Sequence, residues 1–253
     1  MYGSREKVSK IFRNITKPMN LLLIDTSTKH FSLAISKGDK VIIYRNIYLK
    51  KVLSSSIIPA IERILNKAKV SLEQLDGFAV GLGPGSFTSL RVGLSTIKAL
   101  ALAIQKPIVG IPSLDLLAMN YQAKEPVRVC SLVDARRNLV YACLYEKNNL
   151  VLKRKSEYLL TSIDDLFNQL KADSINDKII FIGDGVALFK EQIIQKAKIL
   201  KTKWIPEFQE KNIFPQARNL LSLVQPRFTK KKYDHVDKLL PLYLYPEDCQ
   251  VRS

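Results

Sequence analysis

The sequence has few of the residues that build metal sites and disulfide scaffolds. Its 253 residues include three cysteines, Cys130, Cys143 and Cys249, and two histidines, His30 and His235. No cysteine pair has the C-x-x-C spacing of a thiolate zinc site, and no histidine pair has helical spacing. We therefore expect no metal site in this chain, no disulfide framework and a reducing, cytoplasmic location.

The chain also lacks a long apolar segment. No apolar run reaches the roughly 18 residues that would suggest a membrane span, so we expect no membrane association. Residues 1–18 are polar and basic and lack the apolar centre of a secretory signal. They are predicted to form a disordered leader, and Met19, directly before the first strand, is an alternative start.

Acidic residues are scarce relative to basic ones. Lys and Arg number 40 against 23 Asp and Glu, which gives a formal net charge of +17 and a pI near 9.7. Such a charge favours a polyanionic partner such as tRNA, although a soluble protein from a lysine-rich proteome has the same composition. The lysines are scattered along the chain, so composition alone does not define a binding strip.

A glycine-rich stretch, residues 81–93 (GLGPGSFTSLRVG), lies between a short apolar run and a helical pattern. Gly83 and Gly85 permit a tight turn, and Ser86 or Thr88 can cap the helix. A glycine turn at a helix N-terminus can bind an anion. The Lys of a Walker loop is missing, however, so a tight connection with a good cap is the alternative.

The order of predicted elements occurs twice. Each half has a buried strand ending in Asp, two further strands, a helix, a strand, a glycine loop and another helix. The strands and helices of the first half are predicted at 21–24, 31–35, 41–47, 54–68, 78–80 and 90–104, with a further strand at 108–110. Those of the second half are predicted at 127–133, 139–145, within 150–160, 162–170, 179–182 and 186–197.

This duplication predicts an α/β fold of two lobes, each a mixed sheet flanked by helices, as in actin, sugar kinases and heat-shock ATPases. We expect an N-terminal lobe over 19–112 and a C-terminal lobe over 113–253. The second lobe would begin with a helix at 113–121 and end with a helix at 214–224 and a strand at 239–245.

Two aspartates end equivalent strands and define a candidate nucleotide or anion site. The full candidate set is Asp25, Thr26, Ser27, Gly83, Gly85, Ser86, Thr88, Asp134, Gly183 and Gly185. Residues 26–30 contain no glycine, which makes close approach to a terminal phosphate harder. Turn and cap roles for the two aspartates are the alternative interpretation. A serine hydrolase is disfavoured because the G-x-S-x-G motif is absent.

Three arginines, one on a helix and two in a turn, each have two possible roles. Arg91 lies one turn into an otherwise apolar helix, where it can face an anion or close a salt bridge. Arg136 and Arg137 follow Asp134 and can contact tRNA phosphates or form a polar turn. The helix that carries Arg91 is apolar on nearly all sides, which indicates burial or contact with a partner chain.

Five segments together resemble the bacterial TsaB (YeaZ) family, from residue 20 to about residue 248: IDTS, GLGPGSFTSLRVG, LVDARRNLVYACLY, IGDG and LPLYLYPED. The resemblance implies an actin-like ATPase (ASKHA) fold. It also implies a non-catalytic role beside the TsaD subunit, with the TsaE ATPase, in making threonylcarbamoyladenosine on tRNA. ATP and a metal would then reside on TsaD, and this subunit would need no cofactor and hold no catalytic residue.

The resemblance further implies that TsaD is held by the helices at 54–68 and 87–104. The candidate interface residues are Ile57, Ile61, Ile64, Phe87, Leu90, Leu94, Ile97 and Ala101. Family members often have His-Ser before the first of these helices, where this chain has Leu53-Ser54. A homodimer through the same surface is expected when the partner is absent.

Two other functions remain open at this point. One is an independent actin-like ATPase or kinase that binds nucleotide between the two lobes, at Asp25, Asp134 and the two glycine loops. The other is a nucleic-acid-binding module that uses its lysines alone.

Overall fold

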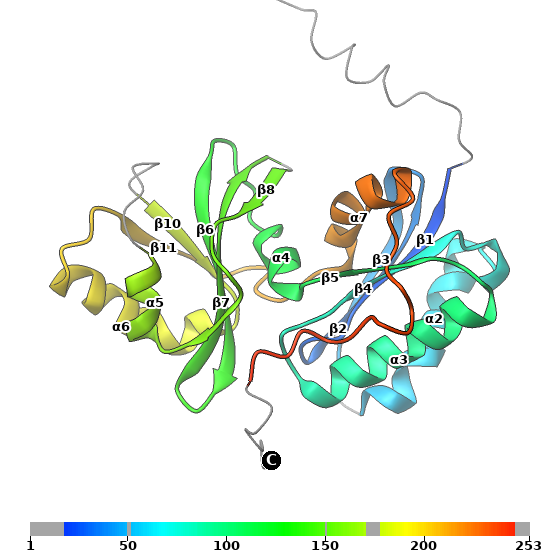
Figure 1. Ribbon diagram of the computed structural model, residues 1–253, viewed down its shortest axis with the longest axis horizontal. Coiled ribbons are helices and arrows are strands. Elements are labelled where there is room, and N and C mark those ends of the chain that lie inside the picture. Colours follow the sequence, from blue (N-terminus) through cyan, green and yellow to red (C-terminus); the bar gives the residue numbers. More distant parts are fainter. Residues whose placement is uncertain (1–17, 50–51, 150, 171–177, 246–253) are drawn as a thin grey trace, which may run out of the picture.

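The computed structural model describes residues 18–49, 52–149, 151–170 and 178–245. The chain forms two lobes, each built on its own sheet, joined by α4 (Ser113–Ala118) (Figure 1). Apart from Pro18, the leader predicted over residues 1–18 lies outside the described residues, as does Cys249.

The first lobe holds a five-stranded mixed sheet. Its order is β3-β2-β1-β4-β5, antiparallel through the first three strands and parallel from β1 to β5. The strands are β1 (Asn20–Asp25), β2 (His30–Lys37), β3 (Lys40–Tyr48), β4 (Gly77–Gly81) and β5 (Ile108–Ile111). Five of the six β1 residues are buried, because helices cover both faces of the sheet and a doubly covered strand is apolar throughout.

Two helices pack side by side on one face of this sheet. They are α2 (Leu53–Ala68) and α3 (Phe87–Ala103), and a 3-10 turn, η1 (Leu72–Gln74), follows α2. The apolar stripe of α2 is buried against β2, β3 and α3, as its helical periodicity predicts. The helix ends at Lys69, whose left-handed backbone directs its N–H to Asn66 O and Leu65 O.

The second lobe repeats this arrangement. Its path is β11-β10-β6-β7-β8, and a short strand, β9, also pairs with β7. The strands are β6 (Val127–Arg136), β7 (Leu139–Asn148), β8 (Val151–Arg154), β9 (Leu159–Thr161), β10 (Lys178–Ile182) and β11 (Ile205–Gln209). Helices α5 (Ile163–Gln169) and α6 (Gly185–Ile199) cover one face. The duplication of sheet order predicted from the sequence is confirmed.

The opposite faces are covered by α4 in the second lobe and, in the first lobe, by η2 (Ala217–Asn219) and α7 (Leu220–Thr229). After β11 the chain returns to the first lobe, so η2 and α7, which lie within the predicted second lobe of 113–253, pack on the first sheet. Phe228 of α7 packs on Gly77 of β4, and Ala217 N donates to Ser32 Oγ of β2. The apolar α7 stripe completes the first lobe's core on this side.

Several predicted elements differ in detail. The helix predicted at 214–224 begins later and continues to Thr229. The strand predicted at 239–245 is not formed, and this segment instead runs along α3, with one backbone bond from Leu242 N to Leu82 O (2.8 Å). Pro241 removes a donor that a strand would need.

Candidate functional site

The glycine loop between β4 and α3 lies directly on the turn that follows β1. Ser86 N donates to Ser27 O at 2.8 Å, and Gly83 N donates to Ser113 Oγ at 2.9 Å. A Cβ added to Gly85 would lie 2.1 Å from Ser27 O. The glycine at position 85 is therefore needed for contact between two backbones, and the chain itself fills the space beside the turn.

Asp25 lies beneath this loop and is fully buried. Its Oδ2 accepts from Ser113 Oγ at 2.6 Å, and its Oδ1 accepts from Ser27 Oγ at 2.7 Å and Ser27 N at 3.0 Å. Burial raises the pKa of this carboxyl, while the three hydrogen bonds act in the opposite direction. Gly81 packs against the carboxylate. Both oxygens are thus used by internal donors, which supports the structural interpretation of this aspartate.

The remaining first-lobe candidates divide between this core and the surface. Thr26 is buried and faces Gly93 of α3, where a Cβ would lie 2.2 Å from Thr26 Oγ1. Thr88 is exposed at the start of α3 and lines a groove of about 390 Å³. The groove is lined by Lys29, Leu49, Val52, Leu53, Ser54, Ser86, Thr88, Ser89 and Val92.

The equivalent positions of the second lobe show a similar packing. Asp134 N donates to Asp184 Oδ1 at 3.1 Å, and burial raises the pKa of the Asp184 carboxyl. Gly183 has a φ of +137° and packs so closely on Leu132 O that a Cβ there would lie 1.9 Å away. Gly185 lies against the same carbonyl. No hydrogen bond of the described residues joins this group to the Asp25 group, so the structure does not link the candidates of the two lobes into one site.

The hairpin after Asp134 carries the two arginines predicted as tRNA contacts. Arg136, Arg137 and Asn138 all have left-handed backbone angles, and both arginines are exposed. Asp134 Oδ1 accepts from Arg136 N at 2.8 Å, and Asp134 Oδ2 pairs with Arg136 Nη1 at 3.2 Å. Asp134 therefore shapes this turn, while Arg136 keeps 78% of its side chain exposed.

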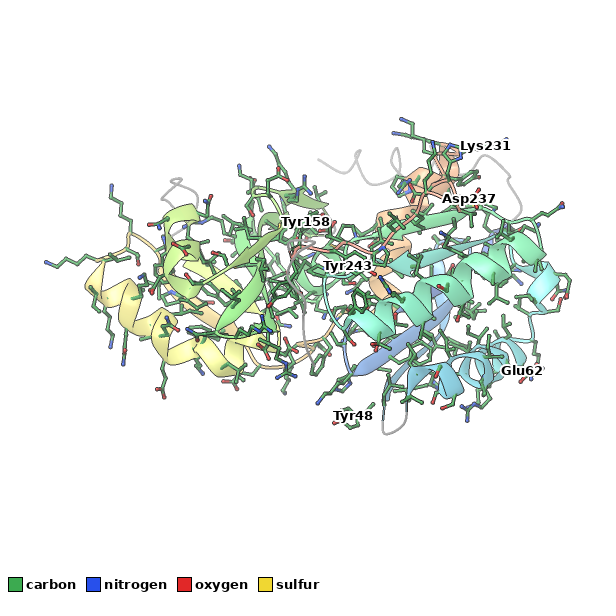
Figure 2. The ribbon with its side chains drawn as sticks, turned by 60° about the horizontal axis from the view of Figure 1, so that its bottom comes forward. Tyr48, Glu62, Tyr158, Lys231, Asp237 and Tyr243 are labelled. Carbon is green, nitrogen blue, oxygen red and sulfur yellow. The ribbon has the colours of Figure 1, made fainter. Side chains whose placement is uncertain are left out.

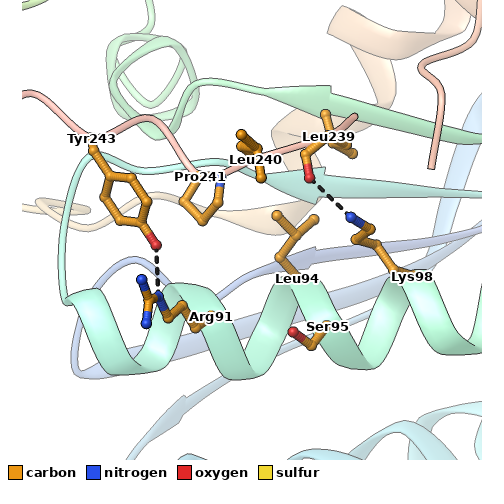
Figure 3. Close-up of a pocket in the computed structure, with 8 residues that line it drawn as sticks. All are labelled: Arg91, Leu94, Ser95, Lys98, Leu239, Leu240, Pro241 and Tyr243. Carbon is orange, nitrogen blue, oxygen red and sulfur yellow. Dashed lines mark hydrogen bonds between the residues drawn. The ribbon is translucent and has the colours of Figure 1, made fainter. Parts of the chain in front are cut away.

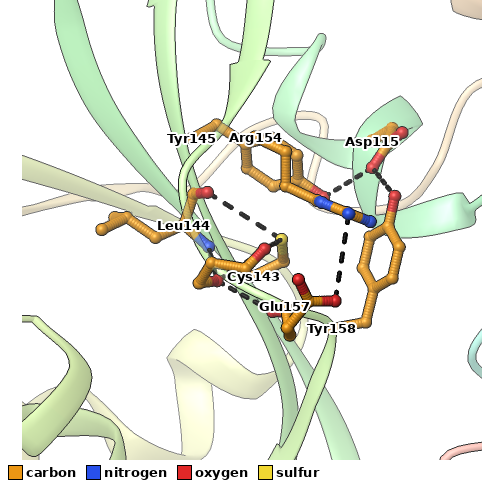
Figure 4. Close-up of polar contacts among 8 residues, drawn as sticks. Asp115, Cys143, Leu144, Tyr145, Arg154, Glu157 and Tyr158 are labelled. Carbon is orange, nitrogen blue, oxygen red and sulfur yellow. Dashed lines mark hydrogen bonds and ion pairs between the residues drawn. The ribbon is translucent and has the colours of Figure 1, made fainter.

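Helix α4 bonds to both lobes. At its first residue, Ser113 Oγ donates to Asp25 of the first lobe. Two residues later, Asp115 Oδ1 accepts from Tyr145 and Tyr158 of the second lobe, at 2.7 and 2.9 Å (Figure 4). Burial raises the pKa of Asp115. After the helix, Asn120 Nδ2 donates to the carbonyls of Asn212 and Phe214, in the segment that returns to the first lobe.

The interface residues predicted on α2 and α3 need a correction. Seven of the eight are at most 5% exposed and belong to the core of the first lobe: Ile57, Ile61, Ile64, Leu90, Leu94, Ile97 and Ala101. Their stripe faces the lobe's own sheet and the neighbouring helix. Phe87 alone of the eight is exposed, at 53%. Sequence periodicity identified an apolar face but not what covers it.

The outward faces of these helices carry other residues. On α3, Thr88, Ser95, Ala99, Leu102 and Ala103 are exposed, and on α2 Ile58 and Glu62 are exposed. Figure 2 shows Glu62 on the outer side of α2, with α3 alongside. Short side chains on an exposed helix allow another helix to approach closely.

Arg91 takes a place that neither sequence interpretation anticipated. Its Nε donates to the hydroxyl of Tyr243 at 3.0 Å, and its guanidinium carbon lies 3.9 Å from the centre of the Phe87 ring. Sequence reasoning missed the role of Tyr243, although the aromatic run at 239–245 was a signal that this segment packs on another surface.

Two kinds of feature are absent from the described residues. They contain no group of three or more His, Cys, Asp or Glu that could hold a metal ion. Their helices include none with the length and apolarity to cross a membrane. Of the two histidines, His30 stacks on Phe214 with ring centres 3.9 Å apart, and burial lowers the pKa of His30.

Comparison with known proteins adds to this geometry. A family model described as TsaD, tRNA N6-adenosine threonylcarbamoyltransferase, matches residues 49–247. The Bacillus subtilis tRNA threonylcarbamoyladenosine biosynthesis protein TsaB is 32% identical over 175 residues, covering 69% of this chain and 75% of the relative. The TsaB of Buchnera aphidicola subsp. Schizaphis graminum is 31% identical over 206 residues, or 79% and 90% of the two chains. The chain belongs to the TsaB (YeaZ) family.

A solved structure shows the same fold. YeaZ from Pseudomonas aeruginosa superimposes with a TM-score of 0.74 at 24% identity, covering 89% of this chain and all of that one. The fold predicted from the sequence, α/β with two duplicated actin-like lobes, is confirmed. In this TsaB chain, the motif GPGSFT packs on the Asp25 turn, and LRVG forms the first turns of α3.

Proposed function

We propose that this chain is a non-catalytic subunit in tRNA threonylcarbamoyladenosine biosynthesis. It supports a TsaD-like subunit that transfers the threonylcarbamoyl group to the tRNA adenosine next to the anticodon. The proposal rests on the contacts around the buried Asp25 carboxylate. Ser27 and Ser113 donate hydrogen bonds to its two oxygens, and the glycine loop packs against it. A nucleotide site needs a carboxylate that is open to a metal or to water.

The docking surface we propose is the outward face of α2 and α3. It combines small residues on α3, such as Ser95 and Ala99, with the exposed apolar side chains of Ile58 and Leu102 (50% and 58% exposed). Exposed apolar residues beside short ones favour a packed helix–helix contact. A second copy of this chain would use the same face when the partner is missing.

ATP and a metal would be bound by the TsaD-like subunit, with a TsaE-like ATPase as a further member of the complex. The tRNA would be reached through the complex. The net charge of +17 supports this proposal, as does the exposed hairpin that holds Arg136 and Arg137.

The test is co-purification of this chain with the TsaD-like subunit of its own organism. Ala99→Glu places a charge on the outward face of α3 and is expected to weaken the complex at least about tenfold, or about 1.4 kcal/mol. The matched control is Ala187→Glu, at an exposed position of α6 in the second lobe. Both variants should melt within about 2 °C of the original chain, because exposed positions contribute little to stability.

Two results would contradict the proposal. One is an Ala99→Glu complex as tight as that of the original chain. The other is formation of threonylcarbamoyladenosine by this chain without any companion. Calorimetry with Mg-ATP on the isolated chain addresses the ATPase alternative, because micromolar binding with turnover would favour that function instead.

A further inference from the structure

A groove runs between α3 and the last described segment of the chain, 239–245. Its volume is about 260 Å³, and Figure 3 shows the segment crossing above the helix. The groove is lined by Arg91, Leu94, Ser95, Lys98, Leu239, Leu240, Pro241 and Tyr243. No acidic side chain is among these eight residues, so two cations lie in an otherwise apolar and neutral groove.

The walls of the groove are held in place by specific contacts. Lys98 Nζ donates to Leu239 O at 3.2 Å, and Leu242 N donates to Leu82 O at 2.8 Å. Leu239 is 8% exposed and packs in the core of the first lobe. The segment is therefore fixed on both sides of Leu240, whose own side chain is 67% exposed.

Arg91 is pre-ordered at one end of the groove. Its guanidinium stacks on Phe87, and the Phe87 and Tyr243 rings lie 5.3 Å apart. Nε is used by the Tyr243 hydroxyl, while the two terminal nitrogens have no acceptor among the described residues. Phe87 and Tyr243 are 53% and 43% exposed. An ordered guanidinium between exposed aromatic rings loses little entropy when it binds, which is typical of energetic hot spots in protein interfaces.

We propose that this groove docks a partner segment that presents a carboxylate to Arg91 and an apolar side chain to Leu240. The inference rests on the proposed function, since α3 is shared with the proposed docking face and the partner is the same TsaD-like subunit. A second copy of this chain fits poorly, because a twofold contact would bring the Arg91 and Lys98 patches together. The aliphatic lining favours a protein segment over RNA.

The test measures affinity for the TsaD-like subunit by calorimetry. Arg91→Glu is expected to weaken binding at least tenfold, because it replaces an attraction with a repulsion. Arg91→Lys keeps the charge but loses the planar fork, so its affinity is expected to lie between those of the original chain and Arg91→Glu. Leu240→Asp, which changes the apolar wall, is expected to weaken binding at least fivefold. Lys153→Glu, on exposed β8 of the second lobe, is the matched charge control and should bind as the original chain does.

The outcomes separate this inference from the proposed function. Suppose that Arg91→Glu and Leu240→Asp bind the TsaD-like subunit as tightly as the original chain does, while Ala99→Glu binds it more weakly. The docking role of the groove would then be refuted, and the proposed function would stand. Failure of the original chain to bind would overturn both. If Arg91→Glu altered only self-association in sedimentation, or only tRNA affinity, the groove would belong to a second copy or to RNA, and the proposal would be wrong.

Discussion

Substitution of Asp25 tests whether its carboxylate is a structural acceptor or a ligand site. In Asp25→Ala, the Ser27 N–H and the Ser27 and Ser113 hydroxyls lose their acceptor. Each buried donor left unsatisfied costs about 1–3 kcal/mol. Because hydroxyls can turn to other acceptors, we expect a loss of about 4 kcal/mol, or about 8–16 °C in melting temperature for a chain of this size.

Asp25→Asn should behave differently, because its amide oxygen can still accept from Ser27. Burial raises the pKa of Asp25, so the folded chain holds this proton at pH values where the unfolded chain has lost it. Wild-type stability supplied by this group is therefore present in acid and is lost as pH rises through the folded-state pKa. The amide has no proton to lose. We expect Asp25→Asn to gain stability relative to the wild type as pH rises from about 4 to about 8.

Melting curves followed by circular dichroism across this pH range measure both effects. Asp25→Ala should be the less stable variant at every pH, and Asp25→Asn should approach or exceed the wild type at neutral pH. Equal losses in the two variants, without a pH trend between Asp25→Asn and the wild type, would show that the negative charge itself is required. The structural role assigned here would then be refuted in favour of a bound cation.

Three further predictions concern stability. Gly85→Ala forces a Cβ to 2.1 Å from Ser27 O and should cost about 3 kcal/mol in urea unfolding. Gly38→Ala, at a partly exposed turn with a φ of +62°, should cost about 1 kcal/mol. Equal costs for the two variants would contradict the close packing at Gly85. Tyr158→Phe removes one hydrogen bond to Asp115 and should cost about 1–2 kcal/mol by the same measurement, whereas no loss would argue against this contact. Lys147 is 1% exposed, and burial lowers its pKa. Lys147→Met should therefore raise the melting temperature at neutral pH, and this gain should shrink as pH approaches the ordinary lysine pKa of about 10.4. A gain that stayed constant with pH would contradict this sign.

The sequence was sufficient to predict the duplicated sheets, because their strands are short apolar runs separated by turn residues. The run at 21–24 and its counterpart at 127–133 form the central strands β1 and β6 of the two sheets. Elements with weaker signals were missed. β11 contains Pro206 and has intermediate or exposed residues throughout, and β9 has three residues, so neither has the apolar alternation that marks a strand.

The role of the candidate site was harder to predict than its location. The residue types at Asp25, Ser27 and Gly85 suit both a ligand loop and a loop that packs on itself. The contacts in the structure distinguish them, above all the 2.8 Å hydrogen bond from Ser86 N to Ser27 O. The interface prediction had the opposite weakness. Apolar periodicity on α3 identifies the buried stripe, whereas an outward stripe of Ser95 and Ala99 has no hydropathy signal.

Helix α4 spans only Ser113–Ala118, yet its contacts determine how far the lobes can move. A hinge motion that opened the two halves would have to separate Ser113 from Asp25, or Asp115 from its two tyrosines. Each such bond to a buried carboxyl is worth about 1.5–3 kcal/mol. In this chain those bonds hold the two lobes together through α4, so the surface proposed on α3 keeps one position relative to the second lobe.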